Sequence, residues 1–344
     1  MSDLTERLAA PKKRKPTNAF RSGNPNKPER DKRGKKSEKR KATENGIKAL
    51  NPNWGYAFVA PFFVMFLIFG LAPVIYSTWI AFFNWDSLAD EQEFYGLTNF
   101  TDLLADEYFW IALRNTFSIW FFSTIPQIFM AIGLASILRN PRLRGATFWR
   151  TILLVPNITS VLAIAIVFGQ LFGRDYGLVN LALTYLGMPA HIDWISETVP
   201  SHIAIATMIT WRWLGYNALI FLAAMLAIPA YLYESADLDG ASKWQQFRYI
   251  TLPQLRNTIT FVLIVGTIGG LQVFAEPLTL GGNMSGGDSR QFSTLTLFLY
   301  EQAFVNNRWG YAAAIGIFIT IIVVIISAIN FAITRVISSE DNTK

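Results

Sequence analysis

Residues 57–83 read AFVAPFFVMFLIFGLAPVIYSTWIAFF and lie inside a charge-free run that extends from Ala49 to Trp85. About 20 apolar residues are enough for a helix to cross the hydrocarbon core of a bilayer. The run is too long for the core of a cleaved signal peptide and follows a polar segment, so we expect a retained transmembrane helix. This stretch alone indicates an integral membrane protein.

Five more charge-free runs along the chain are apolar and long enough to cross a bilayer. The fourth span is expected to begin earlier than its run, near Ile203, which places Arg212 inside it. Every backbone amide in hydrocarbon must be satisfied internally, so helices are the expected structure. The sequence therefore predicts an all-α membrane protein with six transmembrane helices. The five further runs are Asn115–Leu138, Thr151–Gly173, Trp213–Tyr233, Asn257–Ala275 and Trp309–Thr334.

The composition fits this class, with 52% hydrophobic and 16% charged residues, whereas soluble domains carry roughly 25% charged residues. The net charge of +6 comes from the N-terminal segment: residues 1–50 hold 16 Lys and Arg against 6 acidic residues, and the remainder is net acidic. A basic nucleic-acid-binding body is therefore not expected. The chain has no cysteine, which excludes disulfides, thiolate metal sites and cysteine nucleophiles.

Lys and Arg are distributed unevenly between the loops, and this predicts the orientation. Loop 86–113 contains seven acidic residues and no Lys or Arg, whereas the loop after the second span has four Arg and no acid. Basic residues are sparse after the third and fifth spans and recur as Lys243, Arg248 and Arg256 after the fourth. We expect both termini and the second and fourth loops in the cytoplasm, and the other loops outside.

Residues 1–52 are expected to form a basic cytoplasmic tail that is disordered, because they contain too few apolar residues to offset the entropy of ordering. PKKRK at Pro11–Lys15 is similar to a nuclear-import signal, but six spans make that interpretation implausible. A solvated tail that helps fix topology is one interpretation, and attraction to anionic lipid headgroups or an acidic partner is the alternative. Nucleic-acid binding is not expected, since no aromatic residues alternate with the charges.

The fourth loop has the pattern of two short helices joined by a turn. Residues 230–238 have helix-forming composition, with Leu232, Tyr233 and Ala236 at helical spacing. Gly240 supplies a turn, and Ser242 with Gln245 three residues later fits a capping box for a second helix. That helix would place Trp244 and Phe247 on one side. An apolar face on a cytoplasmic loop implies a docking partner.

The same loop carries Glu234-Ser235-Ala236, then Gly240, and after nine more residues Ile250-Thr251-Leu252-Pro253. This spacing resembles the E-A-A…G…I-x-L-P signature of permease subunits of bacterial binding-protein-dependent ABC importers, with Ser235 in place of the usual first Ala. The resemblance covers about residues 53–335 and extends to the carbohydrate-uptake group that includes maltose, glycerol-3-phosphate and oligosaccharide importers. Weaker motifs in the same order support it: Asn84–Asp86, Glu93–Phe100, Ala112–Thr116, Ala227–Pro229 and Leu280–Gly282.

The resemblance implies the type I importer permease fold at 53–335, with a coupling helix in loop 230–254 and a short cytoplasmic tail at 336–344. It implies that this chain carries a mono- or oligosaccharide across the plasma membrane of a bacterium. The implied partners are a second permease subunit, two cytoplasmic ATP-binding subunits and an extracytoplasmic sugar-binding protein. ATP and Mg would then be bound by the partner ATPase. The residues that the resemblance places in ATPase coupling are Glu234, Ser235, Ala236, Gly240, Ile250, Leu252 and Pro253.

Polar groups at membrane depth are costly and often mark a substrate path. Amides can pair with sugar hydroxyls, and aromatic rings can stack on apolar sugar faces; the alternative is hydrogen bonding between helices for the amides and interfacial anchoring for the tryptophans. Pro126, Pro156 and Gly269-Gly270 are expected to break helices locally. Besides Gln127, the candidate path residues are Asn157, Gln170, Trp211, Arg212, Trp213, Asn217, Gln272, Phe274 and Glu276.

The chain contains no Walker A sequence, so we expect no ATP site, no cofactor and no enzymatic activity of its own. His191 and His202 lack metal-ligand spacing, and no metal site is expected. A proton-coupled secondary transporter, in which Glu276 would carry a proton against Arg212, is the alternative to an importer. It leaves loop 230–254 without a role. A neutral sugar is favoured, and a polyol or glycerol phosphate stays open.

Overall fold

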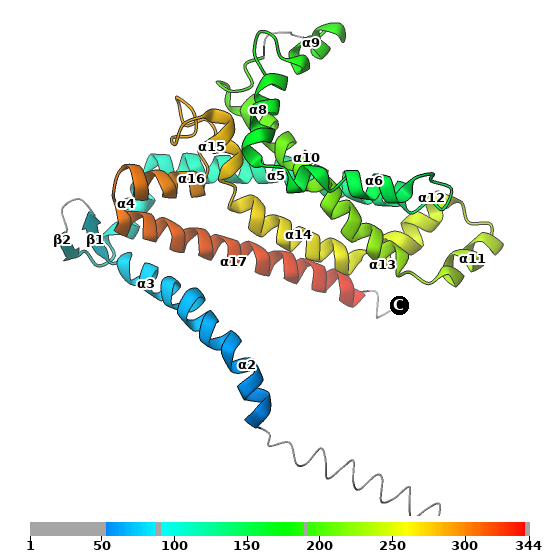
Figure 1. Ribbon diagram of the computed structural model, residues 1–344, viewed down its shortest axis with the longest axis horizontal. Coiled ribbons are helices and arrows are strands. Elements are labelled where there is room, and N and C mark those ends of the chain that lie inside the picture. The colour runs from blue at the N-terminus through cyan, green and yellow to red at the C-terminus, as the bar shows by residue number, and fades with distance from the viewer. Residues whose placement is uncertain (1–52, 87–90, 189–191, 341–344) are drawn as a thin grey trace, which may run out of the picture. The chain divides into compact units, whose positions relative to one another are not determined.

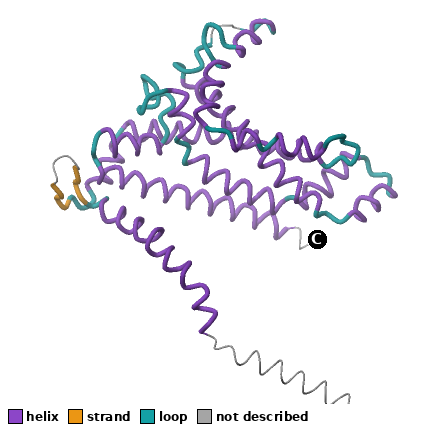
Figure 2. Tube along the Cα trace, in the orientation of Figure 1, coloured by secondary structure: helices purple, strands orange, loops and turns teal. Residues whose placement is uncertain are grey.

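The computed structural model describes residues 53–86, 91–188 and 192–340. The predicted basic tail at 1–52 and the end of the predicted C-terminal tail, 341–344, lie outside these ranges. The chain divides into two units, with the boundary between Gly70 and Leu71. Figures 1 and 2 show the helices, the loops and a two-stranded hairpin of the described residues.

The first unit contains α2 (Asn53–Phe66) and most of a π-helical turn, η1 (Leu67–Leu71). Pro61 lies inside α2. The Phe62 ring lies 5.6 Å from that of Phe63 and 6.3 Å from that of Phe66, which are neighbours at one-residue and four-residue spacing. Together with α3 (Ala72–Ile80), this stretch gives the candidate span Gly55–Ile80, which lies inside the predicted first run.

The second unit is built around two long helices, α5 (Glu107–Leu138) and α10 (Thr198–Leu226), which pack along much of their length. α14 (Arg256–Leu271) packs on both and runs beside α17 (Trp309–Glu340) in Figure 1. One apolar cluster joins α5, α10 and α14 through Ile128, Phe221 and Val262. Because apolar residues of all three helices meet there, the three helices share one hydrophobic core.

A second group of elements packs at the other end of α5. It includes a cluster in which Leu103, Phe109, Leu295, Phe298 and Ile315 meet. α17 packs against α3, α4, α16 and β1. The elements are α3 (Ala72–Ile80), β1 (Phe83–Asp86), β2 (Glu91–Phe94), α4 (Thr98–Ala105), α16 (Leu295–Tyr300) and the π-helical η3 (Glu301–Val305).

The prediction of an all-α protein is wrong in one detail, because β1 and β2 form an antiparallel hairpin in register Phe83 with Phe94. Contacts from α4 and α17 hold this hairpin in position. Asn99 Nδ2 donates to the carbonyl oxygens of Ala81 and Phe83, both at 2.9 Å. Gly310 of α17 lies so close to Phe83 that a Cβ there would be 1.9 Å from its carbonyl oxygen. Long-range contacts, not a local strand pattern, hold this hairpin.

The predicted third span, 151–173, contains a sharp bend. The segment 146–158 and α8 (Val161–Leu171) meet at 94°. The first part comprises α6 (Ala146–Ile152) and α7 (Val155–Ile158), and Pro156 lies at the start of α7. α9 (Leu178–Tyr185) follows α8 and contacts it. Pro156 thus lies close to a break, as predicted, whereas Pro126 lies within the unbroken α5 and its predicted break is wrong.

The fifth run is also bent. α14 continues through Gly269 and Gly270 and ends at Leu271, and α15 (Ala275–Gly281) follows at 45°. α10 begins before Ile203, as expected, and keeps Arg212 inside, but it ends at Leu226 and not at Tyr233. Within the described ranges, four helices are long and apolar enough to cross a membrane, or up to six if each bent pair is one span. The chain is a helical, multi-pass membrane protein.

Candidate substrate cavity and the 230–254 segment

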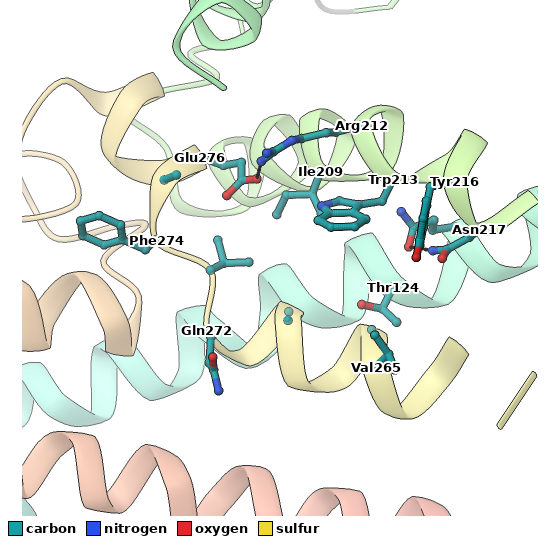
Figure 3. A pocket seen from close by; sticks show the side chains of 16 residues that line it. Thr124, Ile209, Arg212, Trp213, Tyr216, Asn217, Val265, Gln272, Phe274 and Glu276 are labelled. Carbon is teal, nitrogen blue, oxygen red and sulfur yellow. Dashed lines mark hydrogen bonds and ion pairs between the residues drawn. The ribbon is translucent and has the colours of Figure 1, made fainter. Parts of the chain in front are cut away.

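A cavity of about 380 Å³ lies between α5, α10, α14 and the start of α15. Figure 3 shows Arg212, Trp213, Tyr216 and Asn217 on α10, across from residues of α14 and α15. Residues four apart share a face of a helix, which explains why Arg212 and Tyr216, like Trp213 and Asn217, meet the same space. Cavities of this size are typical of small-molecule sites.

The non-helical stretch between α14 and α15, residues 272–274, lines one side of the cavity. Thr294 Oγ1 donates to the Val273 carbonyl at 2.7 Å, which satisfies a backbone acceptor left free where the helix ends. Gly270 makes the close packing of α14 on α5 possible, because a Cβ there would be 2.5 Å from Trp120 Cδ1. Non-helical backbone at membrane depth is tolerated where protein or a polar cavity surrounds it.

An ion pair crosses the cavity from α10 to α15. Arg212 Nη1 donates to Glu276 Oε1 at 2.8 Å, and the side chains are 22% and 8% exposed. The Arg212 guanidinium also lies 5.8 Å from the Trp213 ring. Figure 3 shows Arg212 and Glu276 pointing toward one another. Each charge is therefore largely compensated by the other.

A pair of amides lies on the α5 side. Asn217 Nδ2 donates to Gln127 Oε1 at 3.2 Å, and both residues are buried. Gln127 Nε2 and Arg212 Nε are buried and have no hydrogen-bond partner among the described residues. Buried donors without a partner are costly in a folded protein. Both nitrogen atoms are shielded from solvent, so a ligand in the cavity would reach them only after a side chain rotates.

The structure brings together six of the nine predicted path residues: Arg212, Trp213, Asn217, Gln272, Phe274 and Glu276 all line the cavity, as does Gln127. Three do not line it. Trp211 is half-exposed and packs against Phe168, with ring centroids 5.7 Å apart. Asn157 lies in α7 and Gln170 is exposed on α8, so neither prediction is supported by the cavity.

Sequence reasoning missed Thr124, Ile209, Tyr216 and Val265, which also line the cavity. Tyr216 had a signal, since it follows Arg212 by four residues and therefore shares its helical face. Thr124 lies three residues before Gln127 on α5 and could have been found in the same way. Ile209 and Val265 are apolar and have no sequence signal that separates them from the packed core.

The 230–254 segment adopts the predicted helix–turn–helix. α11 covers Ala230–Leu238, Gly240 has a φ of +76°, and α12 covers Lys243–Gln246. The predicted capping box is confirmed: Ser242 Oγ accepts from the Gln245 amide, and the Gln245 side chain accepts from the Ser242 amide at 2.7 Å. The chain continues through the π-helical η2 (Phe247–Thr251) and α13 (Leu252–Gln254) into α14.

The predicted apolar face of this segment is turned partly inward. Leu232, Tyr233 and Ala236 are half-buried. The Tyr233 hydroxyl lies 2.9 Å from Thr251 Oγ1, and the Arg139 guanidinium lies 4.2 Å from the Tyr233 ring. Trp244 and Phe247 lie on one side as predicted, with their rings stacked 5.6 Å apart. The large residues available to a partner are Trp244 and, outside the predicted face, Tyr231, Leu238 and Tyr249, which are 68%, 64%, 89% and 71% exposed.

The predicted coupling residues also divide into exposed and half-buried ones. Glu234, Ser235, Gly240, Leu252 and Pro253 are exposed. Ala236 and Ile250 are half-buried. Most of the motif is thus accessible on a segment that internal hydrogen bonds hold in shape.

Comparison with known proteins agrees with this architecture. The profile of the family described as "Binding-protein-dependent transport system inner membrane component" matches residues 119–339. The chain is 35% identical over 286 residues to the lactose transport system permease protein LacF of Rhizobium radiobacter, covering 82% of this chain and 94% of that protein. It is also 35% identical to the arabinooligosaccharides transport system permease protein AraP of Bacillus subtilis (strain 168), covering 81% and 88%.

A solved structure has the same fold. It is the crystal structure of a bacterial ABC transporter involved in the import of the acidic polysaccharide alginate, with a TM-score of 0.70 and 25% identity. The match covers 85% of this chain and 98% of that chain. The present chain belongs to the family of inner membrane components of binding-protein-dependent transport systems, and it is an ABC importer permease subunit.

Proposed function

We propose that this chain is one of two permease subunits of an ATP-driven importer that moves a mono- or oligosaccharide into a bacterial cell. The observation that carries this proposal is the cavity, which combines three aromatic side chains with buried amide and guanidinium donors. A few placed polar groups among apolar walls are typical of small-molecule sites. The relatives named for lactose and arabinooligosaccharides support a sugar as the substrate.

The 230–254 segment is the element that couples transport to ATP hydrolysis in this proposal. Two cytoplasmic ATP-binding subunits would bind ATP and Mg, and one would dock on the exposed residues around Glu234 and Trp244. In this proposal a second permease subunit completes the path, and an external binding protein delivers the sugar. The family description, which names binding-protein-dependent transport, supports the second point. The family assignment removes the reason to retain a proton-coupled secondary transporter.

The proposed topology has six spans, each bent pair counting as one, with both termini and the 230–254 segment in the cytoplasm. The Lys and Arg asymmetry between loops supports it. Because the chain has no cysteine, Gln92→Cys and Ser242→Cys each give a single labelling site. An impermeant thiol reagent should label position 92 in intact cells and position 242 only after permeabilisation. The reverse pattern would contradict the orientation and the coupling role together.

The function is tested by purifying the tagged chain from its native host and measuring sugar uptake in cells that lack it. We expect an ATPase and a second permease to co-purify. Lactose or arabinooligosaccharide uptake should depend on this chain, on ATP and on an external binding protein. Purification of the chain alone, together with uptake that ATP depletion leaves unchanged, would contradict the proposal.

The cavity is tested by Gln127→Leu, which removes a buried donor without changing the size of the side chain greatly. A hydrogen bond to a ligand contributes about 1 kcal/mol, so the apparent affinity for the sugar should fall by roughly fivefold. Gln302→Leu is the matched control, because Gln302 is also buried but does not line the cavity. Equal effects of both substitutions would mean that Gln127 acts through stability alone.

A further inference from the structure

The cavity contains a charge pair whose two members cancel. Of the described residues that line it, only Arg212 and Glu276 belong to the basic and acidic residue types. The carboxylate is 8% exposed and lies 2.8 Å from the guanidinium, and both side chains face the same space. A ligand in the cavity therefore meets a dipole and not a net positive charge.

Removal of the carboxylate would change this field. An unpaired guanidinium in a partly dehydrated site creates a positive potential that is far stronger than it would be in water. Without Glu276, Arg212 Nη1 would lose its carboxylate partner, so an anion in the cavity could accept from it. The fork of donors on Arg fits carboxylates well. Arg212 could thus bind an acidic sugar if Glu276 did not occupy it.

We propose that Glu276 is a specificity-determining residue that keeps the cavity selective for uncharged saccharides by neutralising Arg212. This inference rests on the proposed function. A carboxylate that enters a neutral, partly dehydrated cavity loses hydration without gaining a counter-charge. Neutral hydroxyls lose less, and they can form hydrogen bonds with the amide of Gln272, which lines the cavity and is exposed.

The alginate transporter shows why the charge of the cavity matters for selectivity. That transporter imports an acidic polysaccharide and has the same fold at a TM-score of 0.70. The fold therefore does not decide between acidic and neutral sugars. The charge balance of side chains along the path is one way to do so, and in this chain's part of the path a single carboxylate sets that balance.

The electrostatic part is tested with a thiol introduced by Val265→Cys, at a residue that lines the cavity and is 50% exposed. The natural chain has no cysteine, so this thiol is unique in the subunit. The measurement is the ratio of modification rates by an anionic and a cationic methanethiosulfonate reagent in the assembled transporter. This ratio is independent of the fraction of thiolate and reports the local potential.

Glu276→Gln should raise the anion-to-cation ratio by about tenfold or more, as expected for one uncompensated charge at low effective dielectric. In the double variant Arg212→Gln with Glu276→Gln, the anion-to-cation ratio should return to within about twofold of the parental ratio. Glu301→Gln is the matched control, because Glu301 forms a second half-buried pair with Arg290 at 2.6 Å outside the cavity. An unchanged ratio in Glu276→Gln would overturn the inference.

The specificity part is tested by protection of the same thiol with sugar probes at equal concentration. Lactitol and maltitol are neutral disaccharide alcohols with one ring and one open-chain unit, and lactobionate and maltobionate have the same length and the same ring with one carboxylate. The neutral probes should protect the parent at least tenfold better than the acidic ones, and Glu276→Gln should remove or reverse that preference. Equal protection of the parent by acidic and neutral probes would overturn the inference.

The two parts separate this inference from the proposed function. If no neutral probe protects the parent, the proposed sugar function is contradicted, while the reagent ratio still decides whether Glu276 neutralises Arg212. If neutral probes protect but Glu276→Gln leaves their advantage unchanged, the sugar function is retained and the role of Glu276 is refuted.

Discussion

The cavity and the 230–254 segment contain functional polar residues in opposite settings. In the cavity, Gln127, Asn217 and Glu276 are buried and bonded to groups of the same subunit. On the segment, Glu234 is exposed. The difference shows that the cavity can be interpreted from this chain alone, whereas the segment needs a partner to explain why these residues are present.

The exposure of the segment does not come from a lack of internal structure. Gln246 is buried and donates to Asp237 Oδ1 and, at 3.1 Å, to the Ala241 carbonyl, which joins α11, the turn and α12. A preformed surface loses less conformational entropy when it binds. The segment therefore resembles a rigid docking element, and the cavity resembles a site completed by a small ligand.

The largest expected effect separates the two regions. Glu234→Lys reverses an exposed charge on the proposed docking surface, and Gly240→Pro forces φ to about −65° where the turn has +76°. Both should reduce uptake to background and remove ATPase stimulation by the sugar. Sugar protection of a thiol at position 265 should persist, because neither residue lines the cavity.

Asp239→Lys is the matched control for the charge reversal, since Asp239 is exposed on the same turn but lies outside the motif. It should retain most of the uptake. Normal transport by both Glu234→Lys and Gly240→Pro would show that the segment does not couple the subunits. The interpretation of the segment as a docking element, in contrast to the cavity, would then be wrong.

Sequence reasoning found local features reliably, because their causes are local. The capping box at Ser242 and the turn at Gly240 depend on a few neighbouring residues, and both are confirmed. Arg212 and Glu276 were found because charge inside an apolar run is costly whatever the fold. Their 2.8 Å contact, which joins residues 64 apart, could only be proposed as a pairing.

The errors have tertiary causes. Pro126 was expected to interrupt its helix, but packing against α10 keeps α5 continuous. Pro156 lies near a real break, yet nothing local specifies the 94° bend. Trp211 is adjacent to Arg212 in the sequence, but neighbouring residues point to different sides of a helix, and Trp211 packs on Phe168 outside the cavity. Its place in a substrate path stays a prediction.

An intermediate effect is expected where α10 approaches the loop before α7. A Cβ at Gly215 would lie 1.9 Å from the Leu153 carbonyl oxygen, so Gly215→Ala should displace the helix that carries Arg212 and Asn217. Overpacking of this kind typically costs about 1–3 kcal/mol. Thermal unfolding in detergent, followed by size-exclusion chromatography, should show a lower midpoint together with weaker sugar protection of the cavity.

Gly133→Ala is the control for the same change in a helix interior, because nothing lies within 4 Å of its added Cβ. It should leave stability unchanged or increase it by up to about 1 kcal/mol. Hydrogen exchange of the 230–254 segment should be unaffected in both variants. A Gly215→Ala protein that is as stable as Gly133→Ala would show that α10 can move without cost.

The smallest effect is expected from Asp237 on the exposed segment. Lys243 Nζ donates to Asp237 Oδ1 at 2.8 Å, with side chains 80% and 53% exposed. This hydrogen bond, followed by that from Gln246, lowers the pKa of the Asp237 carboxyl below its usual range. Exposed pairs contribute little and are screened by salt. Asp237→Asn should therefore leave uptake near the parental level at neutral pH.

The consequence for pH follows from the sign of the shift. Because the folded pKa is lowered, the stabilisation is present above the pKa of the unfolded chain and disappears as the pH falls through the folded value. Hydrogen exchange of amides 241–246, corrected for intrinsic rates, should become slightly faster in the parent in that acidic range. Asp237→Asn should show the faster rate already at neutral pH, with no further acid step at this site. An identical acid step in both proteins would mean that another group holds the segment together, and that its internal order does not depend on this ion pair.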